Sequence, residues 1–137
     1  MNWLIKNTFI IAAIVACASC TKDEPASNIK PDLTAPVIKI TTPIKNGYEK
    51  DLGPVNIVGT ITDNDLATMS VAAYNITDDQ VLYTKTEAIS GTVVTFSKMY
   101  NKTVNNVGNL IYCVAVVNAK DKVGNTAVDS VYYAMGK

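Results

Sequence analysis

The sequence predicts an all-β fold, and three observations support this prediction. From residue 37 onward, short apolar segments alternate with clusters of turn-forming residues at intervals of about 12 to 17 residues. β-branched residues dominate the apolar segments, and such side chains pack well on the pleated surface of a strand. No segment in this part of the chain repeats its apolar residues with the period of an amphipathic helix.

Seven segments have the character of strands. The clearest is 55–62, where Val55, Ile57, Gly59 and Ile61 share one face. The segment 110–119 is almost continuously apolar, which is typical of a central strand buried on both sides. The full set of expected strands is 37–40, 55–62, 70–76, 81–86, 93–100, 110–119 and 127–133. Seven short strands in roughly 100 residues indicate an immunoglobulin-like antiparallel β-sandwich of about seven strands, with a small β-barrel as the alternative.

The first twenty residues have the organisation of an export signal. Lys6 provides a positive charge, and the run 8–16 is nearly all apolar. That run is too short for a transmembrane helix, which needs about 20 apolar residues. Small residues then lead to a cysteine, so residues 1–19 are expected to be a cleaved signal peptide.

This region resembles the precursors of bacterial lipoproteins. The resemblance implies that Cys20 carries the lipid, with Cys17 as the alternative, since Cys17 follows a more regular lipobox. Lys22, Asp23 and Glu24 are similar to the export signal of surface lipoproteins in the Bacteroidetes group. Several acyl chains on one cysteine hold a protein firmly on a membrane. The expected location is the outer membrane, exposed at the cell surface, with a periplasm-facing orientation as the alternative.

A tether should separate the anchor from the folded domain. Pro25, Pro31 and Pro36 interrupt a polar stretch, so residues 20–36 are expected to be the lipidated cysteine and a flexible linker. Residues 37–137 would then form the β domain.

The domain itself resembles bacterial immunoglobulin-like domains. The likeness lies in the opening segment 32–40, in the segment 58–63 and in the closing segment 117–126, where an Asp is followed three residues later by Gly-Asn. The domain lacks the tryptophan and the cysteine pair of antibody domains. The resemblance therefore implies a sandwich of the bacterial type.

The composition excludes several functions. All twelve basic residues are Lys, and the chain has no His. Without Lys6, eleven Lys face twelve acidic residues, a net charge of about −1, which argues against nucleic-acid binding. Nucleophilic catalysis by Ser-His-Asp or Cys-His groups is impossible without His, so we expect no enzyme. Cys113 lies in an apolar run and is expected to be buried as a small hydrophobic residue.

Acidic residues are expected to meet at one end of the sandwich. The residues are Asp32 before the first strand, Asp63 and Asp65 after the second, and Asp121 and Asn125 in the last turn. Oxygen ligands of this kind suit Ca²⁺, and the resemblance makes a calcium site plausible here. The alternative is that these residues only form turns, because Asp and Asn side chains bond nearby backbone N–H groups.

Tyrosine is the only plentiful aromatic residue, with seven copies. Core and cross-strand packing is the default expectation for them, and Tyr48 is the one most expected to be exposed. Exposed rings would stack on sugars or anchor a protein partner. Asp129-Ser130-Val131 is similar to an O-glycosylation acceptor at Ser130.

The expected function is a non-catalytic binding or adhesion module on a membrane anchor. Its partner would be a surface glycan or an outer-membrane protein. The alternative is a structural spacer, or an accessory subunit of an outer-membrane complex of the glycan-uptake type, with no ligand of its own.

Overall fold

A computed structural model describes residues 30–50, 53–101 and 110–136 of the 137-residue chain. Residues Pro31–Lys137 form one compact unit. The expected signal peptide, both candidate anchor cysteines and the expected export signal lie outside the described residues.

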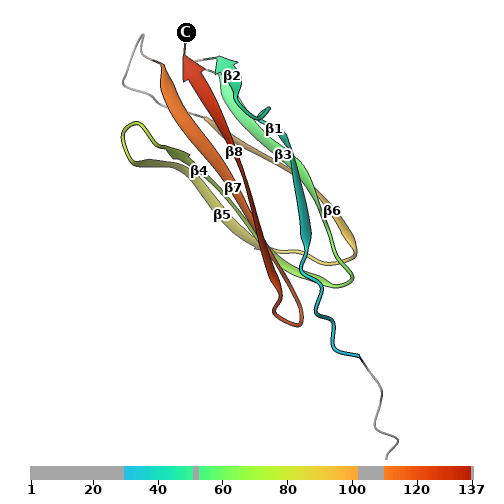
Figure 1. The fold of residues 1–137 in the computed structure, drawn as a ribbon. Coiled ribbons are helices and arrows are strands. Elements are labelled where there is room, and N and C mark those ends of the chain that lie inside the picture. Colours follow the sequence, from blue (N-terminus) through green and yellow to red (C-terminus); the bar gives the residue numbers. More distant parts are fainter. Residues whose placement is uncertain (1–29, 51–52, 102–109, 137) are drawn as a thin grey trace, which may run out of the picture. The chain divides into compact units, whose positions relative to one another are not determined.

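The described residues form eight strands and no helix (Figure 1). All seven strands expected from the sequence are present, most of them longer than the pattern predicted. Their bounds are β1 Val37–Thr42, β2 Gly47–Lys50, β3 Pro54–Thr62, β4 Leu66–Asn75, β5 Gln80–Ala88, β6 Val93–Asn101, β7 Ile111–Asp121 and β8 Thr126–Gly136.

The strands form two sheets, which appear as two layers in Figure 1. One sheet has three strands in the order β1-β3-β6, and the other has five in the order β2-β8-β7-β4-β5. Each sheet has open edges, so the molecule is an immunoglobulin-like β-sandwich, and the small-barrel alternative is wrong.

The sequence pattern missed one strand. β2 is not among the seven expected strands, and it pairs in parallel with β8, from Gly47 opposite Tyr133 to Lys50 opposite Gly136. The backbone N–H of Asn46 donates to the carbonyl of Tyr132 at 2.7 Å and aligns this segment. Four residues are too few to show an alternating pattern in the sequence. Because β2 pairs in parallel, the five-stranded sheet is mixed rather than purely antiparallel.

The core lies between the two sheets. The face of β3 expected from alternation is confirmed, since Val55, Ile57 and Ile61 are each at most 1% exposed. On β7, the residues that share a face with Asp121 are also buried, and Cys113 is one of them. Further core residues from both sheets are Leu66, Met69, Val71, Phe96, Tyr100, Val131, Tyr133 and Met135. Apolar side chains from two sheets thus interdigitate, as sandwich packing requires.

β7 is central in its sheet, as expected, because it pairs with both β4 and β8. The expectation that it is buried on both faces is wrong. Its outward positions alternate with the core positions, and Tyr112 on the outward face is 54% exposed.

Candidate functional site

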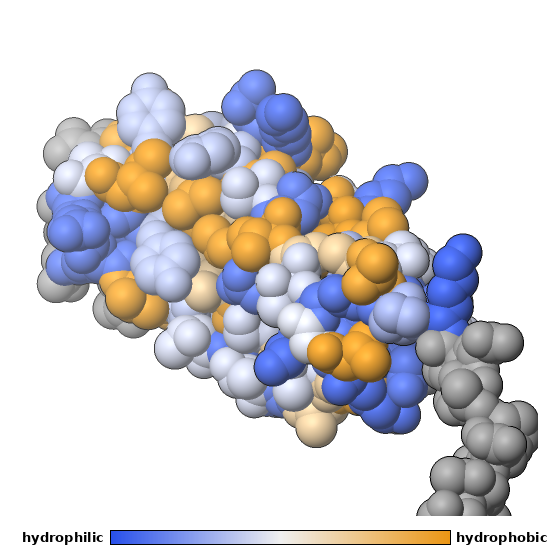
Figure 2. Space-filling model, turned by 60° about the horizontal axis from the view of Figure 1, so that its bottom comes forward, coloured by the Kyte–Doolittle hydropathy of each residue, from blue (hydrophilic) through white to orange (hydrophobic). Residues whose placement is uncertain are grey.

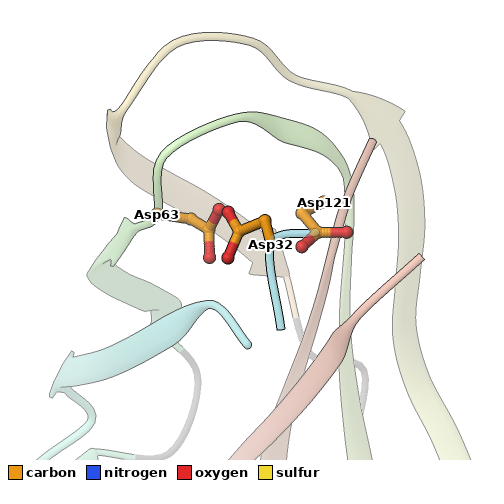
Figure 3. A group of neighbouring side chains, drawn as sticks. All are labelled: Asp32, Asp63 and Asp121. Carbon is orange, nitrogen blue, oxygen red and sulfur yellow. The ribbon is translucent and has the colours of Figure 1, made fainter. Parts of the chain in front are cut away.

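Three acidic side chains from distant segments meet at one end of the sandwich. Asp32 precedes β1, Asp63 follows β3, and Asp121 ends β7. One carboxylate oxygen of each lies within 4.8 Å of the others. Figure 3 shows the carboxylates of Asp32 and Asp63 facing one another, with Asp121 on the other side of Asp32. We call this group the acidic pole, and it brings together three of the five residues expected there.

Asp121 has a structural role at this pole. It is 1% exposed, and its Oδ1 accepts hydrogen bonds from the backbone N–H groups of Gly124 at 2.6 Å and Asn125 at 2.8 Å. Its Oδ2 accepts from Nδ2 of Asn125 at 2.7 Å. These bonds close the β7–β8 turn, where Gly124 has a φ of 105° that favours glycine.

Asn125 presents a donor rather than an oxygen to the pole. Besides Asp121, its Nδ2 donates to the carbonyl oxygens of Asp32 at 3.1 Å and Thr34 at 3.2 Å. This side chain therefore fastens the segment before β1 to the turn between β7 and β8.

Asp65 lies apart from the three clustered carboxylates. Its Oδ1 forms an ion pair with Nζ of Lys122 at 2.6 Å. Its backbone N–H donates to Oδ1 of Asp63 at 3.1 Å. The side chain of Asp63 thus forms the local turn bond that is expected of an Asp two residues before the donor.

The remaining oxygens of the pole differ in their partners. Asp32 accepts from the backbone N–H of Thr34 at 2.9 Å and from Nδ2 of Asn64 at 3.3 Å, and these bonds lower the pKa of its carboxyl.

Oδ2 of Asp63 is buried and, among the described residues, has no hydrogen-bond partner. An open hollow of about 310 Å³, lined in part by Asp63, Asn64 and Thr34, lies beside it. An unpaired buried carboxylate oxygen is costly, so this atom marks a place for a cation or an ordered water.

A second candidate site lies on the outer face of the five-stranded sheet. Four of the seven tyrosines are exposed there, each on a different strand: Tyr48 51%, Tyr74 38%, Tyr112 54% and Tyr132 53%. We call this surface the tyrosine face. Figure 2 shows hydrophobic side chains gathered in a band across the molecule, with hydrophilic groups toward its ends.

Strand pairing arranges these tyrosines in two neighbouring rows. In one row Tyr74 and Tyr132 both pair with Val114, which lies between them on β7. In the next row Tyr112 and Tyr48 both pair with Ala134, which lies between them on β8. Large rings thus flank small residues in each row.

Two small residues on this face are buried without belonging to the core between the sheets. Val114 is 8% exposed and Ala72 on the same face is 7% exposed, yet neither belongs to the core between the sheets. Because alternate residues of a strand point to opposite faces, their burial comes from outward neighbours.

The tyrosine face carries no charged side chain over its next two rows. The paired positions are Thr84, Ala72, Val116 and Ser130 in one row, and Thr86, Ser70, Asn118 and Val128 in the other. Toward the acidic pole the first charged position is Lys120, which pairs with Thr68 and Thr126. At the other end Lys50 pairs with Gly136, one row beyond Tyr48. The rows between these two lysines are uncharged, aromatic and rich in hydroxyl groups.

A pocket of about 190 Å³ opens on this face. Its lining residues are Asn46, Ile76, Tyr112, Cys113, Tyr132, Tyr133 and Ala134, none of which carries a charge at neutral pH. Ile76 reaches the pocket because its backbone N–H donates to the carbonyl of Tyr112 at 2.9 Å.

The default expectation for the tyrosines holds for only some of them. Tyr100 and Tyr133 are buried in the core, and Tyr83 packs against it. Tyr48 is exposed, as expected. Tyr112 is also exposed, contrary to the default expectation. Its grouping with tyrosines from other strands had no sequence signal, since it depends on strand order.

Ser130, the candidate glycosylation residue, is exposed in the middle of β8. It lies on the tyrosine face opposite Val116, and its backbone N–H donates to Oδ1 of Asp129 at 2.8 Å. A glycan on this hydroxyl would stand on the tyrosine face itself.

No protein family matches the chain, and no curated protein does. A similar solved structure is that of Spo0M, a sporulation control protein from Bacillus subtilis, with 14% sequence identity and a TM-score of 0.41. The match covers 75% of this chain and 49% of that chain, so the chain spans about half the length of this neighbour.

None of the described residues belongs to a helix that is long and apolar enough to cross a membrane.

Proposed function

We propose that this chain is a lipid-anchored, non-catalytic binding module that engages its partner through the tyrosine face. The observation that carries the proposal is the grouping of Tyr48, Tyr74, Tyr112 and Tyr132 on one uncharged sheet surface beside a pocket. Depletion of charge and enrichment in tyrosine are typical of the centre of a binding interface.

The position of this surface supports the same function. The chain enters the domain near the β7–β8 turn (Figure 1). Tyr112 lies at the other end of β7, away from Asp121 of the acidic pole. β7 has 11 residues, so at about 3.3 Å per residue its ends lie about 33 Å apart. A tether attached upstream of Pro31 therefore holds the pocket away from the point of entry.

The test compares adhesion of the wild-type chain and a variant of the tyrosine face. The acylated chain is incorporated in vesicles, which are applied to immobilised neutral polysaccharides, charged polysaccharides and proteins. We expect adhesion to at least one surface, and its loss in the double variant Tyr112→Ala/Tyr132→Ala. The control is Thr95→Ala, an exposed residue on the three-stranded sheet.

The spacer alternative makes the opposite prediction. A spacer or accessory subunit without a ligand would adhere to none of these surfaces, or would adhere equally well with and without the tyrosines. Either result would refute the binding-module proposal.

A second role, calcium binding at the acidic pole, is favoured by the unpartnered Oδ2 of Asp63. We propose that Asp32, Asp63 and Asp121 hold a Ca²⁺ ion that neutralises their mutual repulsion. Three carboxylates supply fewer oxygens than the six to eight that Ca²⁺ takes, so waters entering from the adjoining hollow would complete the shell. The ion would stiffen the junction between the tether and the domain.

This role is tested by the thermal unfolding of residues 21–137 in calcium and in chelator. Calcium should raise the midpoint for the wild type, because a ligand bound only by the folded state stabilises it. Asp63→Asn should raise the midpoint in chelator, by removing one of three crowded charges, and should abolish the calcium effect. Asp129→Asn is the matched control outside the pole. If the wild type unfolds at the same midpoint in calcium and in chelator, the three residues do not bind calcium and serve only to form turns.

A further inference from the structure

We propose that the pocket on the tyrosine face binds one ring of an uncharged saccharide, held between Tyr112 and Tyr132. This inference rests on the proposed function, since it names the ligand class of the same surface. It draws on the spacing of the rings, the polar groups of the pocket and the absence of charge.

The spacing of the two tyrosines suits a single flat ring. Tyr112 pairs with Ala134, and Tyr132 lies two residues before Ala134 on the same strand, so the two tyrosines are diagonal neighbours. Diagonal positions in an antiparallel pair are about 7–8 Å apart. That distance separates the bases of the two side chains. Two side chains that stand outward from the sheet at this separation leave room for one ring between them, with a van der Waals contact of about 3.5–4.0 Å on each side.

The residue at the base of the pocket, between the two tyrosines, is small. Ala134 provides one methyl group, and Ile76 and Asn46 line the pocket on opposite sides of it. The resulting volume of about 190 Å³ matches a single small ring rather than an extended side-chain cluster of a folded partner. Aromatic rings and Ile76 provide apolar surface for the C–H groups of a sugar ring.

The polar groups of the pocket both donate and accept hydrogen bonds. The amide of Asn46 and the hydroxyls of Tyr112 and Tyr132 have this dual character. Sugar hydroxyls are also both donors and acceptors, so they can satisfy such groups without any charge. An acidic saccharide or a phosphate would need Lys or Arg, and no residue lining the pocket is charged.

The uncharged rows beyond the pocket give a longer saccharide room to lie along the sheet. Thr84, Ser130 and Thr86 present hydroxyl groups in those rows. The occupant that fits the whole surface is therefore a neutral oligosaccharide with one ring in the pocket.

The test is a calorimetric titration of residues 21–137, a fragment that contains the whole compact unit and its core. The probes are hexasaccharides of β-1,4-linked glucose, β-1,4-linked N-acetylglucosamine and α-linked mannose, with oligogalacturonate as the acidic comparison. We expect saturable binding of at least one neutral probe and none of oligogalacturonate. Tyr112→Ala and Tyr132→Ala should each weaken binding roughly tenfold, a loss of about 1.4 kcal/mol of stacking and contact.

Two further variants test the pocket against a position outside the tyrosine face. Asn46 has a φ of 58°, so Asn46→Gly removes the amide without straining the backbone, and it should also weaken binding. Thr95→Ala changes an exposed residue of the three-stranded sheet and should leave binding within about twofold. Circular dichroism melts confirm that each variant is folded.

Several outcomes would overturn the inference. Binding of protein surfaces through the tyrosines, with no neutral probe bound, would remove the saccharide and leave the proposed function standing. A dimer in sedimentation experiments that Tyr112→Ala dissociates would identify a second copy of the chain as the occupant. Neutral-probe binding that is unchanged in Tyr112→Ala and Tyr132→Ala would place the saccharide elsewhere. Failure of both this titration and the vesicle adhesion test would reject the binding module itself.

Discussion

The hydroxyl groups of Tyr100 on β6 and Tyr133 on β8 are hydrogen-bonded to each other between the two sheets. The two residues belong to opposite sheets and are 4% and 2% exposed. The ring of Tyr83 stacks on Tyr100 with centroids 5.9 Å apart. This bond links the two sheets at a position that no disulfide spans among the described residues.

Removing one of the two hydroxyls should lower the free energy of unfolding by more than removing both. Tyr133→Phe leaves the Tyr100 hydroxyl with only the sulfur of Met135, at 3.9 Å, and should lower the free energy of unfolding by about 1–3 kcal/mol. The double variant Tyr100→Phe/Tyr133→Phe leaves no unsatisfied group and should be no less stable than either single variant. Urea unfolding of the four proteins measures the coupling. Strictly additive losses would show that the hydroxyls do not depend on each other.

Alkaline pH should destabilise the domain through the same pair. Burial raises the pKa of Tyr100 to about 12, from an ordinary value of 10.0, and burial raises the pKa of Tyr133 as well. Below pH 10 both the folded and unfolded states keep these protons, so the stability is complete. Above pH 10 the unfolded state loses protons that the folded state retains, and the free energy of unfolding falls as pH rises.

The measurement is urea unfolding at intervals from pH 8.5 to 11.5. The Tyr100→Phe/Tyr133→Phe variant should lose less stability over this range than the wild type. Tyr132→Phe, an exposed position, is the control and should follow the wild type. Parallel curves for all three proteins would contradict the assignment of the alkaline transition to this pair.

Gly59 permits a close contact within the three-stranded sheet. A Cβ at this position would lie 2.4 Å from the carbonyl oxygen of Lys39 and 2.6 Å from Cζ of Phe96. Gly59→Ala should therefore lower the free energy of unfolding by about 1–3 kcal/mol, as overpacking does. Gly53→Ala, where a Cβ would meet nothing within 4 Å, should change it by less than about 0.5 kcal/mol. Equal effects of the two variants would show that β3 can move away from β1 and β6.

The lipid anchor is tested on the whole chain in a bacterial host with lipoprotein export. Cys20→Ala should abolish labelling by a radioactive or clickable fatty acid, whereas Cys17→Ala should not. Persistent labelling of Cys20→Ala would move the anchor to Cys17. Replacement of Lys22, Asp23 and Glu24 by Ala should keep the lipid but protect the protein from protease added to whole cells.

Much of the fold could be predicted because strand alternation is a local property. β3 shows this, since its buried residues are those that alternation selected. β2 could not be found in the same way, because a four-residue strand in parallel pairing depends on the position of β8. The sequence pattern overestimated the burial of β7, and the outward position of Tyr112 on that strand was not predicted.

The acidic pole could be predicted in outline because a sandwich gathers strand ends at its poles. Asp32, Asp63 and Asp121 therefore meet as expected. The pairing of Asp65 with Lys122 depends on side-chain direction, which turn residues alone do not specify. The tyrosine face could not be predicted, because it needs the order β2-β8-β7-β4 and the registers that align four strands.

Amide hydrogen exchange on residues 21–137, with and without the surface to which the chain adheres, tests the location of binding most directly. We predict slower exchange on binding around Asn46, Tyr112 and Ala134, with no change in β1, β3 and β6. Protection confined to the three-stranded sheet or to the acidic pole would contradict the assignment of the tyrosine face as the binding surface.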